Sequence, residues 1–249
     1  MVKEIPIEIE IRLLDQFLIG SGNPSARGAD ISIAYYKCGD GKYVLPSSTL
    51  KGILRKACNR VVKLIDREWK PCYEIEPGKI RSRCRGLGYE WLELFGIPGY
   101  REDIVNPLLI DELEIAGPPT IYTYTHTSIK LSTQTVKEGA LYTIEYFPPY
   151  TFLRAKLRLL VKENDYERTG LKREKVPKYL KLILLAIMES PVIGIGRNSK
   201  PFEIRVANVA EIRAKLEELG LKIDEELNDL LNRVSKPYGP FTYLGGDLQ

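Results

Sequence analysis

The chain has few of the residues that most catalytic and metal-binding motifs require. Among its 249 residues there are one histidine, His126, and four cysteines, none of which forms a CxxC pair. A catalytic Ser-His-Asp or Cys-His set would need that histidine, and the sequence holds no Gly-x-Ser-x-Gly motif. We expect the cysteines to stay reduced, with neither a disulfide framework nor structural zinc. They are Cys38, Cys58, Cys72 and Cys84.

Long hydrophobic runs are also missing. No apolar stretch approaches the ~18–20 residues that a membrane-spanning helix needs. The first residues alternate in polarity and include acids, whereas a signal peptide has a continuous apolar segment. We therefore expect a cytoplasmic protein without a membrane partner.

Charge is nearly balanced overall, with a net charge of +4, but it is unevenly distributed. Residues 51–85 contain eleven basic and four acidic residues, so the positive charge is concentrated in one segment. A concentrated basic segment on a nearly neutral protein favours a polyanionic partner such as RNA. A solvated basic loop would have the same composition, and both interpretations stay open on charge alone.

Hydrophobic periodicity predicts the elements of a mixed α+β fold. Apolar residues alternate over 5–13, which predicts a half-buried strand, and a helix follows that Ser47 or Ser48 can cap. Alternation at 142–146 and 153–161 predicts a hairpin, whose second strand carries Arg154, Lys156 and Arg158 on one face and so predicts a basic sheet face.

A second core helix is predicted to begin near Pro177, to carry an apolar stripe from Val176 to Ile187, and to stop at Ser190-Pro191. A short strand, 202–206, follows it. The predicted order is strand, helix, hairpin, helix, strand, which matches a βαββαβ ferredoxin-like sandwich.

We interpret residues 1–207 as one domain with insertions at about 20–45, 70–106 and 118–140. Residues 208–249 form a C-terminal appendage on the same domain, with two amphipathic helices split at Gly220. Their excess of acids argues against RNA binding and favours a packing or partner-docking role.

Two local features suggest phosphate binding. Lys51 falls in the first turn of the predicted helix, where a cation opposes the helix dipole unless an anion is present. A flexible lysine that extends away from the helix is the alternative. The loop Gly194-Ile195-Gly196-Arg197 lets backbone amides approach a phosphate, although it lacks the closing residues of a nucleotide-binding P-loop and can also be a simple turn.

Several short motifs occur together in a characteristic order. The chain carries Ile19-Gly20-Ser21-Gly22, Gly28-Ala29-Asp30, Leu45 to Gly52 with Arg55, Leu94-Phe95-Gly96, Gly139 to Glu145, and the loop 194–197. In this order they resemble the RAMP superfamily of CRISPR-associated proteins, and most closely the repeated backbone subunit of type III effector complexes. The resemblance covers about residues 5–206.

The resemblance implies a modified RNA-recognition-motif (RRM) fold whose copies stack along a CRISPR guide RNA, with target RNA, other RAMP subunits and neighbouring copies as partners. Residues 120–140 correspond to a thumb that kinks the guide–target duplex, which gives His126 a possible RNA-facing role beside the alternative of a plain surface histidine. The residues implied to contact the guide are Ser48, Lys51, Arg55, Gly194, Gly196 and Arg197.

The resemblance also implies an activity. Family members cleave target RNA with a divalent metal and an aspartate in the loop after the first strand, which here is Asp30. One carboxylate can hold a hydrated Mg²⁺ or a similar cation while the ribose 2′-OH attacks the adjacent phosphate. Asp40 is interpreted as a turn residue.

Two departures from the family pattern keep other functions open. Asn198 and Ser199 follow Arg197 where the family has further glycines, and the acidic C-terminal helices have no counterpart in it. A non-catalytic structural or end-capping subunit is one alternative. A stand-alone endoribonuclease for precursor CRISPR RNA is another, although that chemistry generally uses a His or Lys acid–base set.

Overall fold

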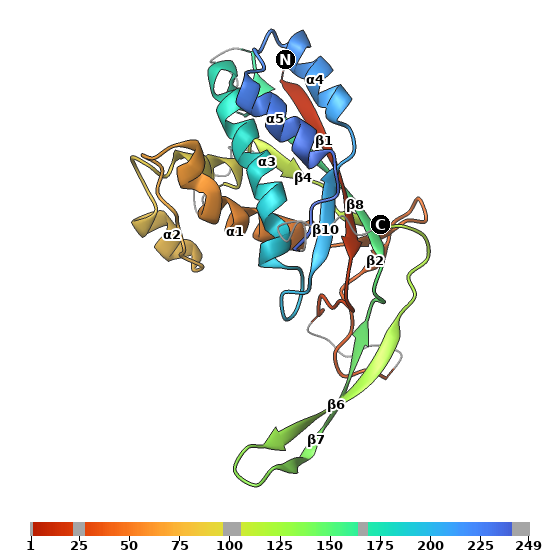
Figure 1. Cartoon of the computed structure of the whole chain (residues 1–249). Helices are drawn as coiled ribbons and strands as arrows, with labels where there is room; N and C mark the ends of the chain where they lie inside the picture. Colours follow the sequence, from red (N-terminus) through yellow and green to blue (C-terminus); the bar gives the residue numbers. More distant parts are fainter. Residues whose placement is uncertain (1, 22–27, 97–105, 164–168, 241–249) are drawn as a thin grey trace.

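The core is an antiparallel sheet with two helices on one face. The computed structural model describes residues 2–21, 28–96, 106–163 and 169–240. Strand β10 (Phe202–Val206) pairs with β1 (Lys3–Leu13), β1 pairs with β8 (Phe152–Lys162), and β8 pairs with the short strands β4 and β5. With helices α1 and α3 between the strands, this is the ferredoxin-like βαββαβ order, which confirms the predicted fold class (Figure 1).

Strand β1 lies inside the sheet, between β10 and β8, and its alternation decides which of its faces is buried. Every second residue from Ile5 to Leu13 is buried against the helices, while Glu4, Glu8 and Glu10 lie on the opposite face. Burial of one such side chain stabilises the fold by about 1.5–3 kcal/mol. A shift of the register by one residue would expose this whole set, so the pairing of Ile5 with Leu159 and its neighbours is strongly specified.

The predicted hairpin of 142–146 with 153–161 is wrong. The partner of β8 on that side is formed by β4 (Leu108–Ile110) and β5 (Leu113–Ile115), which pair with β8 antiparallel. Each has only three residues, too few for alternation to signal a strand. Residues 142–146 belong instead to β7 (Thr135–Tyr146), whose partner is β6 (Tyr122–Lys130).

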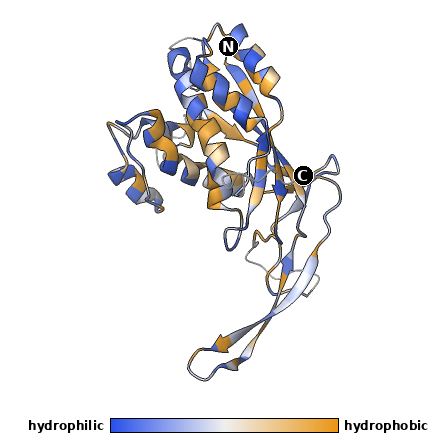
Figure 2. Cartoon of the chain, in the orientation of Figure 1, coloured by the Kyte–Doolittle hydropathy of each residue, from blue (hydrophilic) through white to orange (hydrophobic). Residues whose placement is uncertain are grey.

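Strands β6 and β7 form a two-stranded ribbon, called the thumb ribbon below. It projects from one end of the body (Figure 1). Its outer half carries exposed hydrophobic side chains, including Ile129, Leu131 and Val136. Figure 2 shows hydrophobic residues at its tip and along the helices and the strands of the sheet.

Helix α1 (Ser47–Ile65) buries the predicted apolar stripe, including Leu50, Leu54 and Ala57, between the sheet and α3. The predicted serine cap is absent. Pro46 occupies the N-cap position and no side chain caps the helix among the residues that the structure describes. The proline fixes the extended backbone that leads into the helix, so Ser47 is already its first residue.

Helix α3 (Val176–Ile193) does not stop at Ser190-Pro191 as predicted. Pro191 has no N–H to donate to the carbonyl of Ile187, but the buried Ser190 hydroxyl donates to that oxygen at 2.7 Å. The carbonyl is therefore satisfied, and the helix continues to Ile193.

The expectation of four reduced cysteines is also wrong. Cys72 and Cys84 are joined by a disulfide, whereas Cys38 and Cys58 are free. The disulfide closes a loop around the short helix α2 (Pro77–Arg83), where Ile80 is the buried residue next to it in the core. Spacing alone did not show that these two cysteines meet.

The two predicted C-terminal helices are present as α4 (Val209–Glu218) and α5 (Glu225–Val234). Helix α4 lies against β1 and α5 lies against α3, so their apolar stripes extend the core. Asp224 caps α5 by accepting a hydrogen bond from the backbone N–H of Leu227 at 2.8 Å.

The remaining short elements include three strands at the margin of the sheet, where β3 pairs with β5, β2 with β3, and β9 with β8. They are β2 (Tyr36–Lys37), β3 (Tyr43–Leu45), β9 (Leu171–Lys172) and the 3₁₀ turns Glu90–Leu94 and Arg173–Lys175. None of the helices in the described part of the chain is long and apolar enough to span a membrane.

The Ser190 hydroxyl predicts a measurable cost in stability. Ser190→Ala leaves the buried Ile187 carbonyl without a partner, so we expect a loss of about 1–3 kcal/mol in urea unfolding. Adding Pro191→Ala restores a backbone N–H, and the double variant should be more stable than Ser190→Ala alone. Equal stability of the single and double variants would contradict this account.

Candidate nucleic-acid interface

Most of the sequence-predicted site residues lie on segments that meet at one edge of the sheet. The end of β1 pairs there with the start of β10, Leu13 with Phe202, and with the start of β8, Arg12 with Phe152. The loop after β1, the thumb ribbon before β8 and the glycine-rich loop before β10 therefore leave the sheet at the same edge (Figure 1).

The glycine-rich loop needs its glycines. Gly194 ends α3 with φ of 75°, and a Cβ at this position would lie 2.3 Å from the backbone oxygen of Ser199. Gly196 has φ of 66°, and a Cβ there would lie 2.4 Å from the carbonyl oxygen of Leu18. Both glycines thus allow a close approach of backbone to backbone that no other residue permits.

The loop closes as a tight turn. Ile195 and Lys200 exchange two backbone hydrogen bonds of 2.9 Å. Asn198 and Ser199, which follow Arg197 in this loop, adopt φ of 66° and 49°. The left-handed geometry that glycine favours is therefore retained at both positions with other residues, and asparagine tolerates it better than most.

The loop is held against the segment that follows β1. The Arg197 N–H donates to the Leu18 carbonyl at 2.9 Å, and Lys200 forms an ion pair of 2.6 Å with Asp15. The hydrogen bond from Lys200 lowers the pKa of the Asp15 carboxyl. The backbone of Arg197 is therefore fixed while its side chain is exposed to solvent.

Two half-buried cations of helix α1 have no carboxylate partner among the residues that the structure describes. Lys51 and Arg55 lie one turn apart and are half-buried, and among the described residues neither forms an ion pair. Burial lowers the pKa of both side chains, and the nearby Arg55 charge lowers the pKa of Lys51 further. By contrast, Arg60 on the same helix pairs with Glu189 of α3.

This arrangement favours a bound anion. Nη2 of Arg55 is buried without a hydrogen-bond acceptor in the part of the chain that the structure describes. A buried, unpaired donor costs free energy that a phosphate oxygen could recover. Ser48 lies in the first turn of the same helix and is exposed.

Asp30 lies beside the base of the thumb ribbon. Its Oδ2 accepts hydrogen bonds from the backbone N–H of Thr143 at 2.7 Å and from the Thr143 hydroxyl at 3.1 Å. Oδ1 accepts none from the described residues. The carboxylate is exposed, so one oxygen is held by the protein and the other remains accessible.

His126 lies on β6, on a face of the ribbon rich in aromatic side chains. Its ring stacks on Tyr142 with centroids 5.5 Å apart, and its Nε2 is 3.2 Å from the Tyr146 hydroxyl. Tyr124 packs edge-on against Tyr146. His126 is thus engaged within the ribbon and makes no hydrogen bond or ring contact with Asp30 or Arg197.

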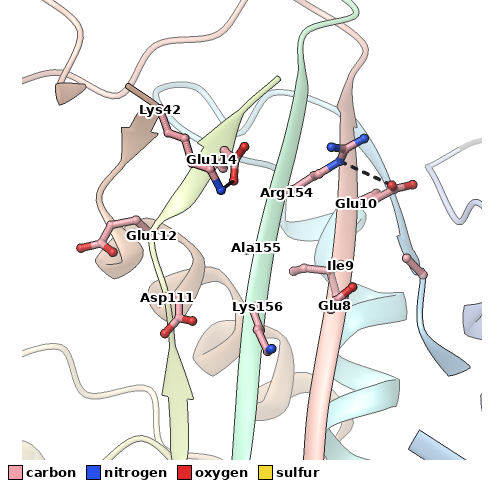
Figure 3. Close-up of a pocket in the computed structure, with 11 residues that line it drawn as sticks. Glu8, Ile9, Glu10, Lys42, Asp111, Glu112, Glu114, Arg154, Ala155 and Lys156 are labelled. Atoms are coloured by element: carbon pink, nitrogen blue, oxygen red, sulfur yellow. Dashed lines mark hydrogen bonds and ion pairs between the residues drawn. The ribbon is translucent and has the colours of Figure 1, made fainter. Parts of the chain in front are cut away.

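The predicted basic sheet face is wrong, because acids of neighbouring strands face the same side. Arg154 pairs with Glu10 of β1 at 3.6 Å, and Lys42 pairs with Glu114 of β5 at 2.8 Å (Figure 3). The residues that line a pocket of about 500 Å³ on this face include more acids than bases. The residues are Glu8, Ile9, Glu10, Lys42, Asp111, Glu112, Glu114, Arg154, Ala155, Lys156 and Ala207.

The predicted site residues form separate groups in the structure. Gly196 and Arg197 contact the segment after β1, and Gly194 lies against Ser199 within its own loop. Lys51 lies beside Arg55 on α1. Among the described residues, no hydrogen bond or ion pair links these groups to Asp30. The described part of the chain also contains no cluster of three or more His, Cys, Asp or Glu side chains that could hold a metal ion.

Sequence reasoning gave no role to two residues that support Asp30. Thr143 and Glu145 were part of the motif 139–145, but the motif alone did not show what they contact. In the structure both bind the loop that carries Asp30. The motif alone could not show which residues these two side chains contact, because their partners lie 112 and 113 residues away in the sequence.

Comparison with known proteins identifies the family. The sequence model of the RAMP superfamily matches residues 10–200, which is most of the chain, so the protein belongs to this superfamily. RAMP proteins act in CRISPR complexes with RNA and other subunits, and membership indicates a CRISPR-associated RNA-binding protein. A comparison with curated proteins found no match.

The unpaired cations of α1 predict where RNA binds. Replacing Lys51 and Arg55 together by alanine should weaken binding of an unstructured RNA by about tenfold or more at low salt and make the salt dependence shallower by roughly 1–2 in slope. Fluorescence anisotropy at several salt concentrations measures both quantities.

A matched control removes the same charge from the sheet face that carries Glu10 and Arg154, called the open sheet face below. Arg154→Ala with Lys156→Ala should leave RNA affinity within about twofold, because acids already neutralise that surface. Equal losses from the two double variants would show that net charge, and not the α1 site, governs binding.

Proposed function

We propose that this protein is a subunit of a type III CRISPR effector complex that binds guide RNA and cleaves guide-paired target RNA with a divalent metal. The observation that carries this proposal is the position of Asp30 in a RAMP protein. Its carboxylate is exposed, and Oδ2 is hydrogen-bonded to Thr143 at the base of the thumb ribbon. Guide RNA, target RNA, other RAMP subunits and copies of the same chain are the proposed partners.

We assign guide binding to helix α1 and the glycine-rich loop 194–197, together called the helix–loop side below. Lys51 and Arg55 offer unneutralised charge, and Ser48 offers a hydroxyl in the same turns of α1. Gly194 and Gly196 hold a turn that presents the exposed Arg197. These groups recognise phosphates and carry no base-reading pattern, so recognition of the guide is expected to be largely independent of sequence.

The open sheet face has a different character. RRM-type proteins stack bases on aromatic side chains of this face. Here β1 and β8 present paired charges instead, including Glu10 with Arg154 and Arg158 with Glu4. This supports the helix–loop side as the RNA-binding side.

The cleavage site fits a weakly held divalent cation. Mg²⁺ usually keeps several waters and binds through one or two carboxylates together with substrate phosphates. Asp30 provides one such carboxylate, with Oδ1 accessible and Oδ2 fixed by Thr143. When bound, the ion would stabilise negative charge that develops on the phosphate during cleavage.

The reaction itself takes place within the target RNA. The 2′-oxygen of the ribose attacks the adjacent phosphorus, the bond to the 5′-oxygen breaks, and the 2′-hydroxyl proton leaves as the 5′-oxygen gains one. The products are a 2′,3′-cyclic phosphate and a 5′-hydroxyl. A 2′-deoxy substitution at the cut position of the target therefore blocks this reaction without removing any phosphate.

A purely structural subunit is the second candidate, and one observation favours it. The hydrogen bonds between Asp30 and Thr143 would tie the loop to the ribbon even without catalysis. A stand-alone endoribonuclease for precursor RNA is supported less, because His126 is the single histidine and is engaged with Tyr142 and Tyr146.

The test compares Asp30→Asn with the parent in a reconstituted complex with Mg²⁺. Asparagine keeps an oxygen that can accept from Thr143 but lacks the negative charge, so the loop should stay in place. We expect single-turnover cleavage of target RNA to fall about 100-fold or more while RNA affinity is unchanged. Product ends are identified by mass spectrometry.

Asp40→Asn is the matched control. Asp40 Oδ1 accepts a hydrogen bond from the Lys42 N–H at 3.1 Å, which confirms that Asp40 is a turn residue. Its substitution should leave cleavage unchanged. Full cleavage by Asp30→Asn would make this chain a structural subunit, and metal-independent cutting of precursor RNA would support the stand-alone enzyme.

A further inference from the structure

The loop that carries Asp30 pairs with the base of the thumb ribbon through an isolated parallel β-bridge between Ile31 and Ile144. Ile31 donates its N–H to the Thr143 carbonyl at 3.1 Å, and Glu145 donates its N–H to the Ile31 carbonyl at 3.0 Å. The Ile33 N–H donates to the buried carboxylate of Glu145 at 3.1 Å. Residues 31–33 are therefore hydrogen-bonded alongside residues 143–145 of β7.

Thr143 makes the densest contacts in this pairing. Its backbone N–H and its hydroxyl both reach Asp30 Oδ2, and its hydroxyl oxygen lies 3.2 Å from the Asp30 N–H. The same hydroxyl is 3.3 Å from the Gly28 carbonyl. One hydroxyl thus holds both the backbone and the side chain of Asp30.

We propose that Thr143 is a positioning residue that couples the thumb ribbon to the Asp30 carboxylate. This inference rests on the proposed function, in which Asp30 takes part in cleavage. RNA that contacts the ribbon and the carboxylate that acts on RNA then belong to one hydrogen-bonded unit. The hydroxyl holds Oδ2 of the exposed carboxylate and leaves Oδ1 without a hydrogen bond from the described residues.

The hydroxyl is the part of Thr143 that substitution can test. The hydroxyl has one hydrogen, and Asp30 Oδ2 is the closer of its two acceptors, at 3.1 Å against 3.3 Å for Gly28. Valine removes the hydroxyl but keeps the β-branched shape and the backbone N–H. Serine keeps the hydroxyl and removes only a methyl group.

The chain offers a matched control on the same face of the ribbon. Thr125 lies on β6 directly opposite Thr143. Its exposed side chain makes no hydrogen bond within the described part of the chain. Thr125→Val therefore makes the same chemical change at a position that does not touch Asp30.

The test uses the reconstituted complex and two readouts. Thr143→Val should lower single-turnover cleavage about 10- to 100-fold through loss of orientation, with RNA affinity unchanged. Thr143→Ser and Thr125→Val should cleave within about threefold of the parent, because neither loses the hydroxyl of Thr143. Parental cleavage by Thr143→Val, or failure of serine to restore cleavage, would overturn the inference.

Amide hydrogen exchange of residues 28–33 gives a readout that does not depend on activity. Exchange of the Asp30 amide should accelerate about tenfold in Thr143→Val and remain at the parental rate in Thr143→Ser and Thr125→Val. Unchanged exchange in Thr143→Val would overturn the coupling.

Asp30→Asn, measured in the same series, separates this inference from the proposed function. Cleavage lost in Asp30→Asn and retained in Thr143→Val would refute the positioning role alone. Cleavage retained in Asp30→Asn would refute the catalytic role of Asp30, whatever Thr143 does.

Discussion

The pairing of β1 with β8 is the constraint on which the rest of the structure depends. Each strand buries alternate residues, from Ile5 to Leu13 and from Leu153 to Val161, so their register can take one value only. Because β1 ends where β8 and β10 begin, this register places the loop after β1, the thumb ribbon and the glycine-rich loop at a common edge. A slip would separate the parts of the candidate site as well as exposing the core.

Charge compensation then distinguishes the two sides of the molecule. Acids and bases on adjacent strands neutralise each other on the open sheet face, as Glu10 does with Arg154 and Arg205. On α1, Lys51 and Arg55 are half-buried and face no carboxylate among the described residues. An approaching phosphate is therefore attracted more strongly to these cations of α1 than to the paired charges of the sheet face. The local pairing of charges decides where RNA binds more than the net charge of +4 does.

The sequence predicted the parts of the fold that periodicity encodes. The long alternations of β1 and β8 and the apolar stripe of α3 gave the correct fold class. The strand next to β8 was nevertheless assigned to residues 142–146, which pair with β6 instead. Strands β4 and β5 were missed because three residues carry no period. Three further contacts depend on the folded structure and not on a local sequence pattern. They are the Cys72–Cys84 disulfide, the hydrogen bond from Ser190 to the Ile187 carbonyl, and the contact of Asp30 with Thr143.

The thumb ribbon shows how rigidity is distributed around the candidate site. An isolated two-stranded ribbon is marginally stable in water. Near the body, Ile144 and Tyr146 are buried, and Phe147 exchanges two backbone hydrogen bonds with Phe17. Farther out, Leu131 is 95% exposed, so the outer half is not packed against the described residues of the body. The packed base holds Asp30 through Thr143, whereas the exposed outer half is the part of the ribbon that is available to contact other molecules.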